Sequence, residues 1–477
     1  MEGPAVSPAA FGALDESSRY LDNRLALMGR SPIEGLSLCL FRPPPRMRRP
    51  IPEPGSKTMN IVIVSAVFPP EPVVTAQTSF QIADELFHHG HQVTVLSPFP
   101  NRPDGRLFKG YRRSLYHRES MGFSVIRCFS FLSRKSTMGS RLLENLGFAL
   151  TCSGRLLLLP RPDVIYMNTW GIFSPGLVCA VAWLRRIPVA VSIQDIYPES
   201  LSQQKRISAH SFLFRVLRAI DRSIAHSAKA LIVISDQFRE TYRLDRGVPA
   251  ERIYVLQNWG ETSAVNVDAR GAYGLRQKYG ILDQTTLAVY AGNIGAAAGV
   301  ETAIKAFEYL WNEENLCMLI AGVGSSLRAC QQLVDEKRLQ DRIFFHTPWP
   351  KKDTGIVLGA ADVLLLPTQG EQSLVSVPSK LISYMLSGRP VLAMVLANSE
   401  TAKLIIKAKA GWVIPPDDPA GTAAALKVIA ASAPEDIRAA GARGLDYALS
   451  NLTREANLPR MIQLLLETAE PGTVRSV

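Results

Sequence analysis

The sequence predicts an α/β fold made of two Rossmann-like domains that face a central cleft. Short, nearly continuous apolar runs such as 61–65 alternate with longer segments of helical spacing such as 76–89, and a second series of the same kind begins near Leu287. Runs of this type are typical of parallel strands that helices cover on both faces. Glycine-rich turns follow the first two runs of the second series.

The first half begins with an apolar run that ends in a Pro69-Pro70 loop. A helix is expected over 76–89, with Phe80 and Leu86 among the apolar residues on one side, and Gly90 follows it as a stop signal. Six further runs read as buried strands. The strands expected in this half lie at 61–65, 93–96, 125–129, 164–167, 189–193, 231–234 and 253–256.

The second half repeats the alternation. A strand at 287–291 leads into a glycine turn and then a helix, where Val300, Ile304, Phe307 and Trp311 follow helical spacing. Another helix begins near Ser379. The strands expected in this half lie at 287–291, 317–321, 343–345, 363–366, 391–394 and 412–414.

These patterns divide the chain into four parts. Residues 1–58 contain Pro43-Pro44-Pro45 and lack sustained periodicity, so a disordered extension is expected there, and Met59 directly precedes the first strand. The extension lacks the pattern of a signal peptide. The expected parts are the extension 1–58, an N-terminal Rossmann-like domain 59–262, a C-terminal Rossmann-like domain 263–455, and a segment 456–477 with a helix that packs back on the N-terminal domain before a tail.

The net charge of +11 is concentrated in one segment, 102–141, which has ten basic residues against Asp104 and Glu119. Aromatic residues interleave these charges, which favours an anionic surface. No nucleic-acid motif accompanies them, so membrane headgroups or a lipid-linked substrate are favoured over nucleic acid, with a merely solvated face as the alternative. The amphipathic run 138–159 fits a membrane surface or a core helix equally well.

Other residue classes exclude several functions. No apolar run reaches the ~20 residues that span a bilayer. The six cysteines have no Cys-x-x-Cys pair and read as buried reduced thiols. Neither a Gly-x-Gly-x-x-Gly nor a Walker A sequence is present, and no Asp-x-Asp pair or histidine spacing offers a metal site. We therefore expect no cofactor and no metal.

Three features of the second half predict an anion site for a nucleoside diphosphate. The first glycine turn contains Gly292, Asn293 and Gly295, and the second contains Gly322 and Gly324. Both follow strands and precede helices, where backbone N–H groups bind phosphate.

The third feature is a predicted helix start at Ser379, whose hydroxyl is expected to cap the helix, followed by Lys380. A cation in the first turn is unfavourable to the helix dipole unless an anion is near. Glu400, after the next strand, is a further donor-binding candidate. The alternative is a set of tight turns and a capped helix with a solvated lysine.

The first half offers carboxylates at a strand end. Asp195 and Glu199 follow the strand at 189–193, where they are candidates to orient hydroxyl groups or to take a proton. The alternative is that they only begin the next helix. Pro70 and Glu71 after the first strand, and Asn258 at the domain junction, are candidates for the facing loops.

From Met59 to about Leu465 the chain resembles the retaining nucleotide-sugar glycosyltransferases of family four, which have the two-domain GT-B fold. The segment 99–111 is similar to the subgroup that includes bacterial O-antigen and capsule fucosamine transferases. The matching landmarks are Phe68-Pro69-Pro70-Glu71, Gly90 to Leu96, Asp195 to Ser200, Asn258-Trp259, Tyr290 to Gly295, Ala361-Asp362-Val363, Val377 to Lys380, Gly388 to Val391 and Gly411-Trp412-Val413.

The resemblance implies metal-independent transfer of a hexose, with retention, from a nucleoside diphosphate donor, usually UDP, to a lipid-linked or polysaccharide acceptor. The donor would bind the C-terminal domain and the acceptor the N-terminal one. The protein would act in the cytoplasm as a peripheral protein at the inner face of the plasma membrane. The departing phosphate would itself take the acceptor proton, so electrostatic stabilisation of that phosphate would be the main protein contribution.

The chain also departs from the family pattern. Two glutamates that many members carry are replaced by Val375 and Ser383, and the segment 296–299 replaces a basic pair after the first glycine turn. Lys380 is therefore expected to supply the missing positive charge. Two alternatives stay open: a nucleotide-sugar epimerase of the same fold, and a degenerate sugar-nucleotide-binding protein without catalysis.

Overall fold

The N-terminal domain is built on an eight-stranded sheet with the strand order β3-β4-β2-β1-β5-β6-β7-β8. A computed structural model describes residues 57–102, 105–132, 138–168, 171–203, 207–260, 267–374 and 378–470, so the predicted disorder of 1–58 falls almost wholly outside the described residues. The strands are β1 (Asn60–Ser65), β2 (Gln92–Pro98), β3 (Tyr116–Ser120), β4 (Ser124–Cys128), β5 (Val164–Asn168), β6 (Val189–Ile193), β7 (Ala230–Val233) and β8 (Ile253–Val255).

Every pair of neighbours in this sheet is parallel except β3 and β4. The seven predicted strands are all present. Strand β3 was not predicted, because its sequence Tyr-His-Arg-Glu-Ser lacks an apolar run and its residues are half-buried or exposed at the sheet edge. Counted without β3, the order is that of a doubly wound Rossmann sheet, which reverses direction between β1 and β5.

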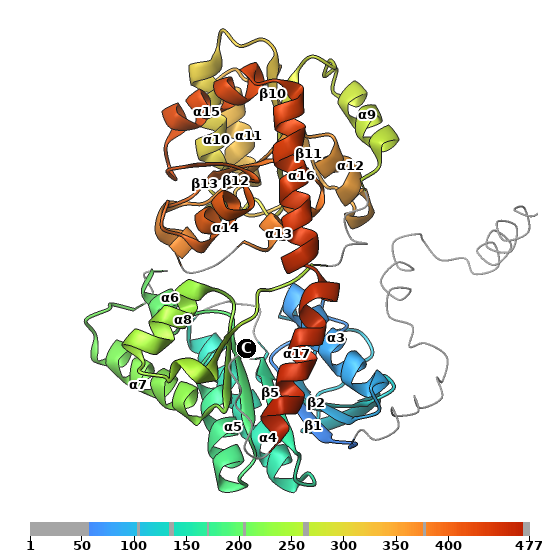
Figure 1. Cartoon of the computed structure of the whole chain (residues 1–477), viewed down its shortest axis with the longest axis vertical. Helices are drawn as coiled ribbons and strands as arrows, with labels where there is room; N and C mark the ends of the chain where they lie inside the picture. The colour runs from blue at the N-terminus through green and yellow to red at the C-terminus, as the bar shows by residue number, and fades with distance from the viewer. Residues whose placement is uncertain are drawn as a thin grey trace, which may run out of the picture. The chain divides into compact units, whose positions relative to one another are not determined.

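Helices cover both faces of this sheet (Figure 1). One face packs against α4 (Met138–Leu158), α5 (Phe173–Leu184), α7 (Phe212–Ser227) and α8 (Asp236–Glu240). The other face packs against α3 (Val74–His88) and α17 (Arg454–Ala469), whose buried leucines return the end of the chain to the first domain. Shorter elements are α6 (Glu199–Gln203), η1 (Thr241–Asp245) and η2 (Ala250–Arg252).

The C-terminal domain has a six-stranded, all-parallel sheet with the order β11-β10-β9-β12-β13-β14. All six strands were predicted. The order reverses between β9 and β12, which is the switch point where ligands bind in open α/β sheets. The strands are β9 (Thr286–Ala291), β10 (Leu316–Ala321), β11 (Ile343–His346), β12 (Val363–Pro367), β13 (Val391–Met394) and β14 (Gly411–Ile414).

The second sheet also lies between two helical layers. One layer contains α9 (Ala269–Lys278), α12 (Thr354–Gly359), α13 (Ser379–Leu386), α14 (Glu400–Ala408) and α16 (Pro434–Asn451). The other contains α10 (Val300–Ala306), η5 (Phe307–Leu310), α11 (Leu327–Glu336) and α15 (Pro419–Ala431). The remaining short turns are η4 (Ala296–Ala298), η6 (Lys351–Asp353) and η7 (Gly370–Leu374).

Three predictions about residue classes can be compared with this fold. The five cysteines in the described ranges are all buried and unpaired, as expected, and Cys39 lies outside those ranges. Within the described residues, no helix combines the length and hydrophobicity needed to cross a membrane. The same residues contain no cluster of three or more potential metal ligands.

Candidate functional site in the C-terminal domain

The two predicted glycine turns pack directly against each other at the ends of β9 and β10. The backbone N–H of Ile294 donates to the carbonyl of Val323 at 2.9 Å. A Cβ atom at Gly322 would overlap the carbonyl oxygen of Gly292, and one at Gly324 would overlap the carbonyl of Ile294. Gly322 and Gly324 are therefore required for the close approach of the two loops.

Lys380 lies on the first of these loops. Its Nζ donates to Tyr290 Oη at 2.7 Å and lies 4.6 Å from the centroid of the Tyr290 ring. A Cβ atom at Gly292, where φ is 151°, would overlap the Lys380 side chain, so the glycine makes room for the lysine. The structure thus brings together two residues that the sequence separates by almost ninety positions.

The charge of Lys380 has no carboxylate partner among the described residues. Within the part of the chain that the structure describes, its one polar contact is the Tyr290 hydroxyl, and burial lowers the pKa of the lysine to about 8. A cation that is partly removed from water without a counter-charge is destabilised unless an anion binds beside it. An anion beside Lys380 would remove this cost, which makes the position a candidate anion site.

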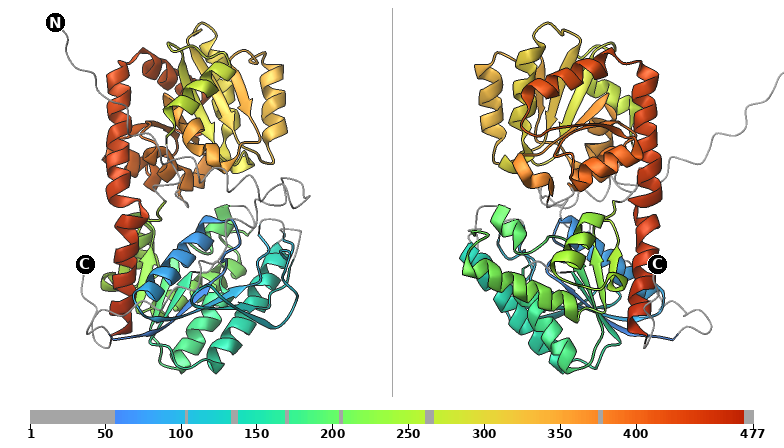
Figure 2. Two further views of the ribbon diagram at one scale, coloured as in Figure 1. Left: turned by 90° about the vertical axis from the view of Figure 1, so that its right-hand side faces the viewer. Right: turned by 60° about the vertical axis from the view of Figure 1, so that its left-hand side comes forward.

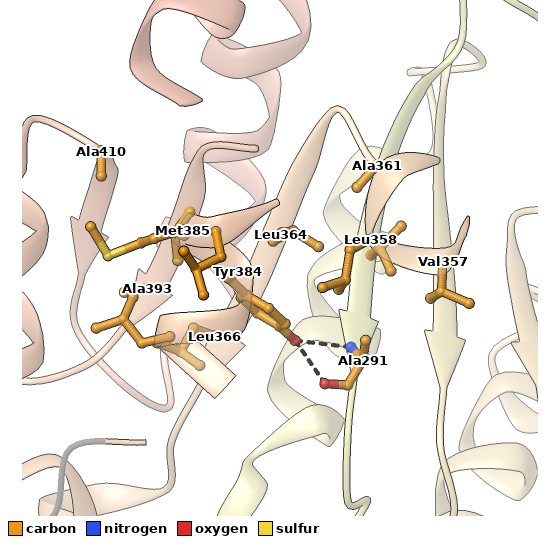
Figure 3. Packing of buried hydrophobic residues seen from close by; sticks show 14 of the residues in the cluster. Ala291, Val357, Leu358, Ala361, Leu364, Leu366, Tyr384, Met385, Ala393 and Ala410 are labelled. Carbon is orange, nitrogen blue, oxygen red and sulfur yellow. Dashed lines mark hydrogen bonds between the residues drawn. The ribbon is translucent and has the colours of Figure 1, made fainter. Parts of the chain in front are cut away.

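Tyr384 fixes the helix that carries Lys380. Its hydroxyl accepts from the backbone N–H of Ala291 at 2.9 Å and donates to the Ala291 carbonyl at 3.0 Å (Figure 3). Residues four apart in a helix lie on the same face, so this double hydrogen bond holds Lys380 over the end of β9. In turn, Tyr290 Oη donates to the carbonyl of Asn293 at 2.6 Å and orders the glycine turn.

The prediction that Ser379 caps α13 is wrong. Pro378 occupies the N-cap position, no side chain caps the helix, and Ser379 is its exposed first residue. A proline fits there because it needs no N–H partner and its φ of −61° is already suitable. The serine hydroxyl is therefore free of a capping bond at the same helix start as Lys380.

The other donor-binding candidates are placed differently. Asn293 is exposed beside Gly295, which has an ordinary extended φ of −107°. Glu400 begins α14 and forms an ion pair of 2.8 Å with Lys403. Of the two positions where family glutamates are replaced, Ser383 lies within α13 and Val375 is outside the described residues. Gly292 and Lys380 lie against each other, whereas no contact among the described residues links Glu400 to either of them.

Candidate functional site in the N-terminal domain

Glu71 is buried in the loop after β1, where it contacts the loop that follows β2. It follows Pro70, which is joined to Pro69 by a cis peptide bond. One carboxylate oxygen accepts from the backbone N–H groups of Asn101 and Arg102, each at 2.9 Å, and the other accepts from Phe68 N at 3.2 Å. Burial outweighs these hydrogen bonds and raises the pKa of Glu71 to about 7.

We expect the Glu71→Gln variant to be less stable by about 1–3 kcal/mol at pH 8, because an amide N–H₂ would face buried backbone donors. The raised pKa also means that Glu71 stabilises the fold most below pH ~4.5 and loses this contribution as the pH rises through about 7. Urea unfolding at several pH values would show that the free energy of unfolding depends less on pH in this variant than in the wild type. Glu251→Gln, at an exposed glutamate, is the control. It should change neither the stability at pH 8 nor the dependence of stability on pH.

A buried arginine supports the same loop. The side chain of Arg127 is fully buried, forms an ion pair with Glu119, and donates to the carbonyl of Pro69. Its guanidinium lies 5.8 Å from the ring centroid of Tyr111, whose hydroxyl donates to Glu119 at 3.0 Å. These contacts connect the loop after β1 to β3 and β4.

Arg127 belongs to the predicted basic segment 102–141, and not all of that segment is exposed. Arg102 and Arg141 both pair with Glu144, at 2.6 and 3.0 Å, so three of the ten cations serve internal contacts. Arg134 and Lys135 lie outside the described residues. The exposed remainder consists of Arg106, Lys109, Arg112, Arg113 and Arg118. The segment is thus not one continuous cationic face.

Asp195 and Glu199 follow β6 as predicted but have different surroundings. Asp195 is exposed at the rim of a cavity of about 110 Å³, and the atoms that crowd this recess raise the pKa of its carboxyl. Glu199 is the first residue of α6 and forms an ion pair of 2.7 Å with the buried Arg246. This ion pair makes Glu199 an anchor for the loop that carries Asp195.

Asn258 joins the same edge of the sheet. Its Nδ2 donates to Gln194 Oε1 at 2.9 Å, and Gln194 in turn donates to Ser192 at 3.1 Å. The loops after β6 and β8 are therefore linked beside Asp195. A larger cavity of about 870 Å³ lies at the opposite end of this sheet, among residues such as Trp183 and Arg186, away from the switch point.

Sequence reasoning missed the residues that hold the candidates in place, namely Tyr290, Tyr384, Arg127, Asp221 and Arg246. The one available signal was the spacing of Lys380 and Tyr384 by one helical turn, which places both on one face. No local pattern marks the arginines, because their carboxylate partners lie 8 to 47 positions away.

Comparison with known proteins identifies the family. Residues 75–259 match the family described as glycosyl transferase 4-like domain, and residues 285–432 match glycosyl transferases group 1. WcaI of Escherichia coli strain K12, named as a glycosyl transferase of colanic acid biosynthesis, is 24% identical over 72% of this chain and 86% of its own length.

Two solved structures share the fold. WaaG, a glycosyltransferase involved in lipopolysaccharide biosynthesis, has a TM-score of 0.60 and 18% identity, covering 85% of this chain and 99% of its own. HepE of Anabaena in complex with UDP-glucose has a TM-score of 0.60 and 14% identity, covering 86% and 99%. Two matched family domains in the expected order, on two doubly wound sheets, show that the chain belongs to the GT-B glycosyltransferases of family four.

Proposed function

We propose that this glycosyltransferase moves a hexose from a UDP-hexose donor to a lipid-linked or polysaccharide acceptor in bacterial surface glycan biosynthesis. The anomeric configuration of the hexose is retained in the product. The observation that carries the donor assignment is the half-buried Lys380, which lies against Gly292 at the switch point without a carboxylate partner. The UDP-glucose complex of HepE supports the choice of nucleotide, and WcaI and WaaG support the glycan pathway.

The proposed chemistry depends on stabilising the diphosphate as it leaves. We infer that the cation of Lys380 acts on the diphosphate together with the positive N-terminus of α13, the helix whose first turn carries it. Such preorganised charge stabilises the departing phosphate, which takes the proton of the acceptor hydroxyl. Asp195 remains the candidate that orients this hydroxyl, whereas Glu199 is a positioning residue. Because the positive charge comes from the protein, we propose that turnover needs no metal ion.

Calorimetric titration with UDP tests the donor site. Lys380→Ala is expected to weaken UDP binding by about ten- to a hundredfold, because one charge-assisted hydrogen bond to phosphate is worth about 1.5–3 kcal/mol. Lys305→Ala, which removes an exposed lysine from α10 of the same domain, is the matched control and should bind UDP normally. Wild-type UDP affinity in a folded Lys380→Ala variant would refute the assignment.

The same site gives a pH signature. Since burial lowers the pKa of Lys380 to about 8, UDP affinity should be constant below that value and fall up to tenfold per pH unit above it. Lys380→Arg should retain binding at high pH, because arginine stays protonated. A wild-type affinity that is flat up to pH 10 would show that the lysine does not bind the phosphate.

Product analysis tests the reaction itself. Purified protein with membranes should release UDP and form a glycoside with the anomeric configuration of the donor, and EDTA should leave the rate unchanged. Release of free sugar or an epimer without an acceptor would indicate the epimerase alternative. UDP binding without turnover on any membrane fraction would indicate a binding protein.

A further inference from the structure

The outer surface of α4, α5 and α7 exposes large apolar side chains in an ordered pattern. On α4, Leu143, Leu150 and Leu157 recur at seven-residue intervals, and all three are exposed. Seven residues are close to two helical turns, so these leucines form one stripe along the outside of the helix. The opposite side of α4 packs into the core of the domain. Core packing thus explains one face of this helix and leaves the stripe unexplained.

The neighbouring helices continue this surface. Trp183 and Leu184 at the end of α5 are 80% and 67% exposed, and Phe212 at the start of α7 is 74% exposed. Helix α5 packs against both α4 and α7 (Figure 2). Arg185 Nη1 donates to the carbonyl of Leu156 at 2.6 Å and joins the ends of α4 and α5. Leu157 and Trp183 therefore belong to one surface, which we call the α4–α5–α7 face.

The three helices expose basic side chains, and acidic side chains lie only at the border of the face. Among the described residues, the charged or titratable side chains that α4, α5 and α7 expose are arginines and His226, whose ring contacts the carbonyl of Arg246. The two carboxylates on the three helices, Glu144 and Asp221, are largely buried in ion pairs with Arg141 and Arg246. On the adjacent α8 and its following turn, Asp236 and Glu240 pair with arginines of their own, and Asp245 is exposed at the end of that turn. Asp163 and Glu470 border the face beside Trp183. The arginines on or bordering the face are Arg141, Arg155, Arg185, Arg186, Arg215, Arg218 and Arg222.

From this juxtaposition of leucines, tryptophan and arginines we propose that the α4–α5–α7 face docks on an anionic phospholipid bilayer. Apolar side chains enter the headgroup boundary, arginines meet the lipid phosphates, and tryptophan is favoured at such an interface. A second copy of the chain is the competing occupant, but two such faces would oppose arginine to arginine. The inference rests on the proposed function, which places the acceptor at a membrane.

Co-sedimentation with vesicles tests docking without any donor, so it can fail separately from the UDP experiments. The protein should bind vesicles of phosphatidylcholine mixed with phosphatidylglycerol, and bind those of phosphatidylcholine alone much more weakly. Leu143→Gln/Leu150→Gln/Leu157→Gln should reduce binding to the mixed vesicles by at least about tenfold. The control is Trp311→Gln/Val428→Gln/Leu449→Gln, at comparably exposed apolar positions of the C-terminal domain, which should bind as the wild type does.

A second variant keeps the test decisive if the leucine variant folds poorly. Arg155→Gln/Arg215→Gln/Arg222→Gln should lower binding to the anionic vesicles by about fivefold per arginine and leave the weak binding to phosphatidylcholine unchanged. Equal binding by wild type and both variants would overturn the proposal. It would also be overturned if the wild type bound no vesicles and sedimented as a dimer that the leucine substitutions convert to a monomer.

Discussion

The Gly322→Ala variant is expected to lose about 2–6 kcal/mol of stability together with UDP binding. At Gly322 φ is 150°, and a Cβ atom would overlap the carbonyl oxygen of Gly292. A strained backbone conformation costs about 1–3 kcal/mol, and overpacking adds about 1–3 kcal/mol. Neither loop can yield easily, because the backbones of β9 and β10 are hydrogen-bonded up to the turn. Chemical denaturation and UDP titration measure the two effects.

Gly274→Ala is the matched control for this prediction. Gly274 lies within α9 of the same domain, and a Cβ atom there would meet nothing within 4 Å. Alanine is the better helix former by about 0.5–1 kcal/mol, so this variant should be unchanged or slightly more stable. If Gly322→Ala were as stable as Gly274→Ala, the glycine would not be explained by loop packing. If it folded normally but failed to bind UDP, Gly322 would contact the ligand directly.

Much of the fold was predictable because burial on both faces of a parallel sheet leaves apolar runs that are visible in the sequence. The inner strands follow this rule, among them β9 with its Leu-Ala-Val-Tyr-Ala run. The parallel edge strands β8, β11 and β14 are only partly buried, yet each keeps a short apolar run. Strand β3 has no such run, because it is an antiparallel edge strand with no buried residue and with exposed His117 and Arg118. The sequence of such an edge strand is set by solvent and by its one neighbour, and it carries no apolar signal.

The candidate site was predictable in its members but less so in its contacts. Glycine after a strand marks a close approach, which is why Gly292 and Gly322 could be chosen, and the contact of Gly292 with Lys380 agrees with that choice. The predicted cap at Ser379 was wrong by one position. A serine beside a helix start is a common N-cap, and the sequence does not show that Pro378 takes the N-cap place and Ser379 the first helical position. Contacts between distant residues, such as Lys380 with Tyr290, have no local signature.

Replacing Arg246 with methionine is expected to destabilise the protein by about 3–5 kcal/mol at pH 8, because it leaves buried charge without a partner. The fully buried guanidinium of Arg246 pairs with Asp221 at 2.9 Å and with Glu199 at 2.7 Å, and it donates to the carbonyl of Tyr197 at 2.8 Å. It thereby ties the loop that carries Asp195 to α7. Chemical denaturation and turnover would both register the loss.

The pH dependence of the Arg246→Met variant separates lost charge pairing from lost packing. Burial raises the pKa of Asp221 to about 6 even beside the arginine, and removal of Arg246 should raise it further. A raised carboxyl pKa means that stability declines as the pH rises through that pKa. The loss of stability in Arg246→Met relative to the wild type should therefore be smaller at pH 5 than at pH 8. The added substitution Asp221→Asn should therefore recover stability at pH 8.

A surface pair provides the control for this substitution. Arg243 makes an ion pair of 2.6 Å with Glu240, in which both side chains are exposed, and Arg243→Met should change stability by less than about 1 kcal/mol. The two arginines lie three positions apart and make similar hydrogen bonds, so only burial distinguishes them. A deficit of Arg246→Met that is the same at pH 5 and pH 8, and that Asp221→Asn does not relieve, would assign its effect to side-chain packing. The arginine would then support the Asp195 loop through its shape, and the ion pairs with Asp221 and Glu199 would contribute little.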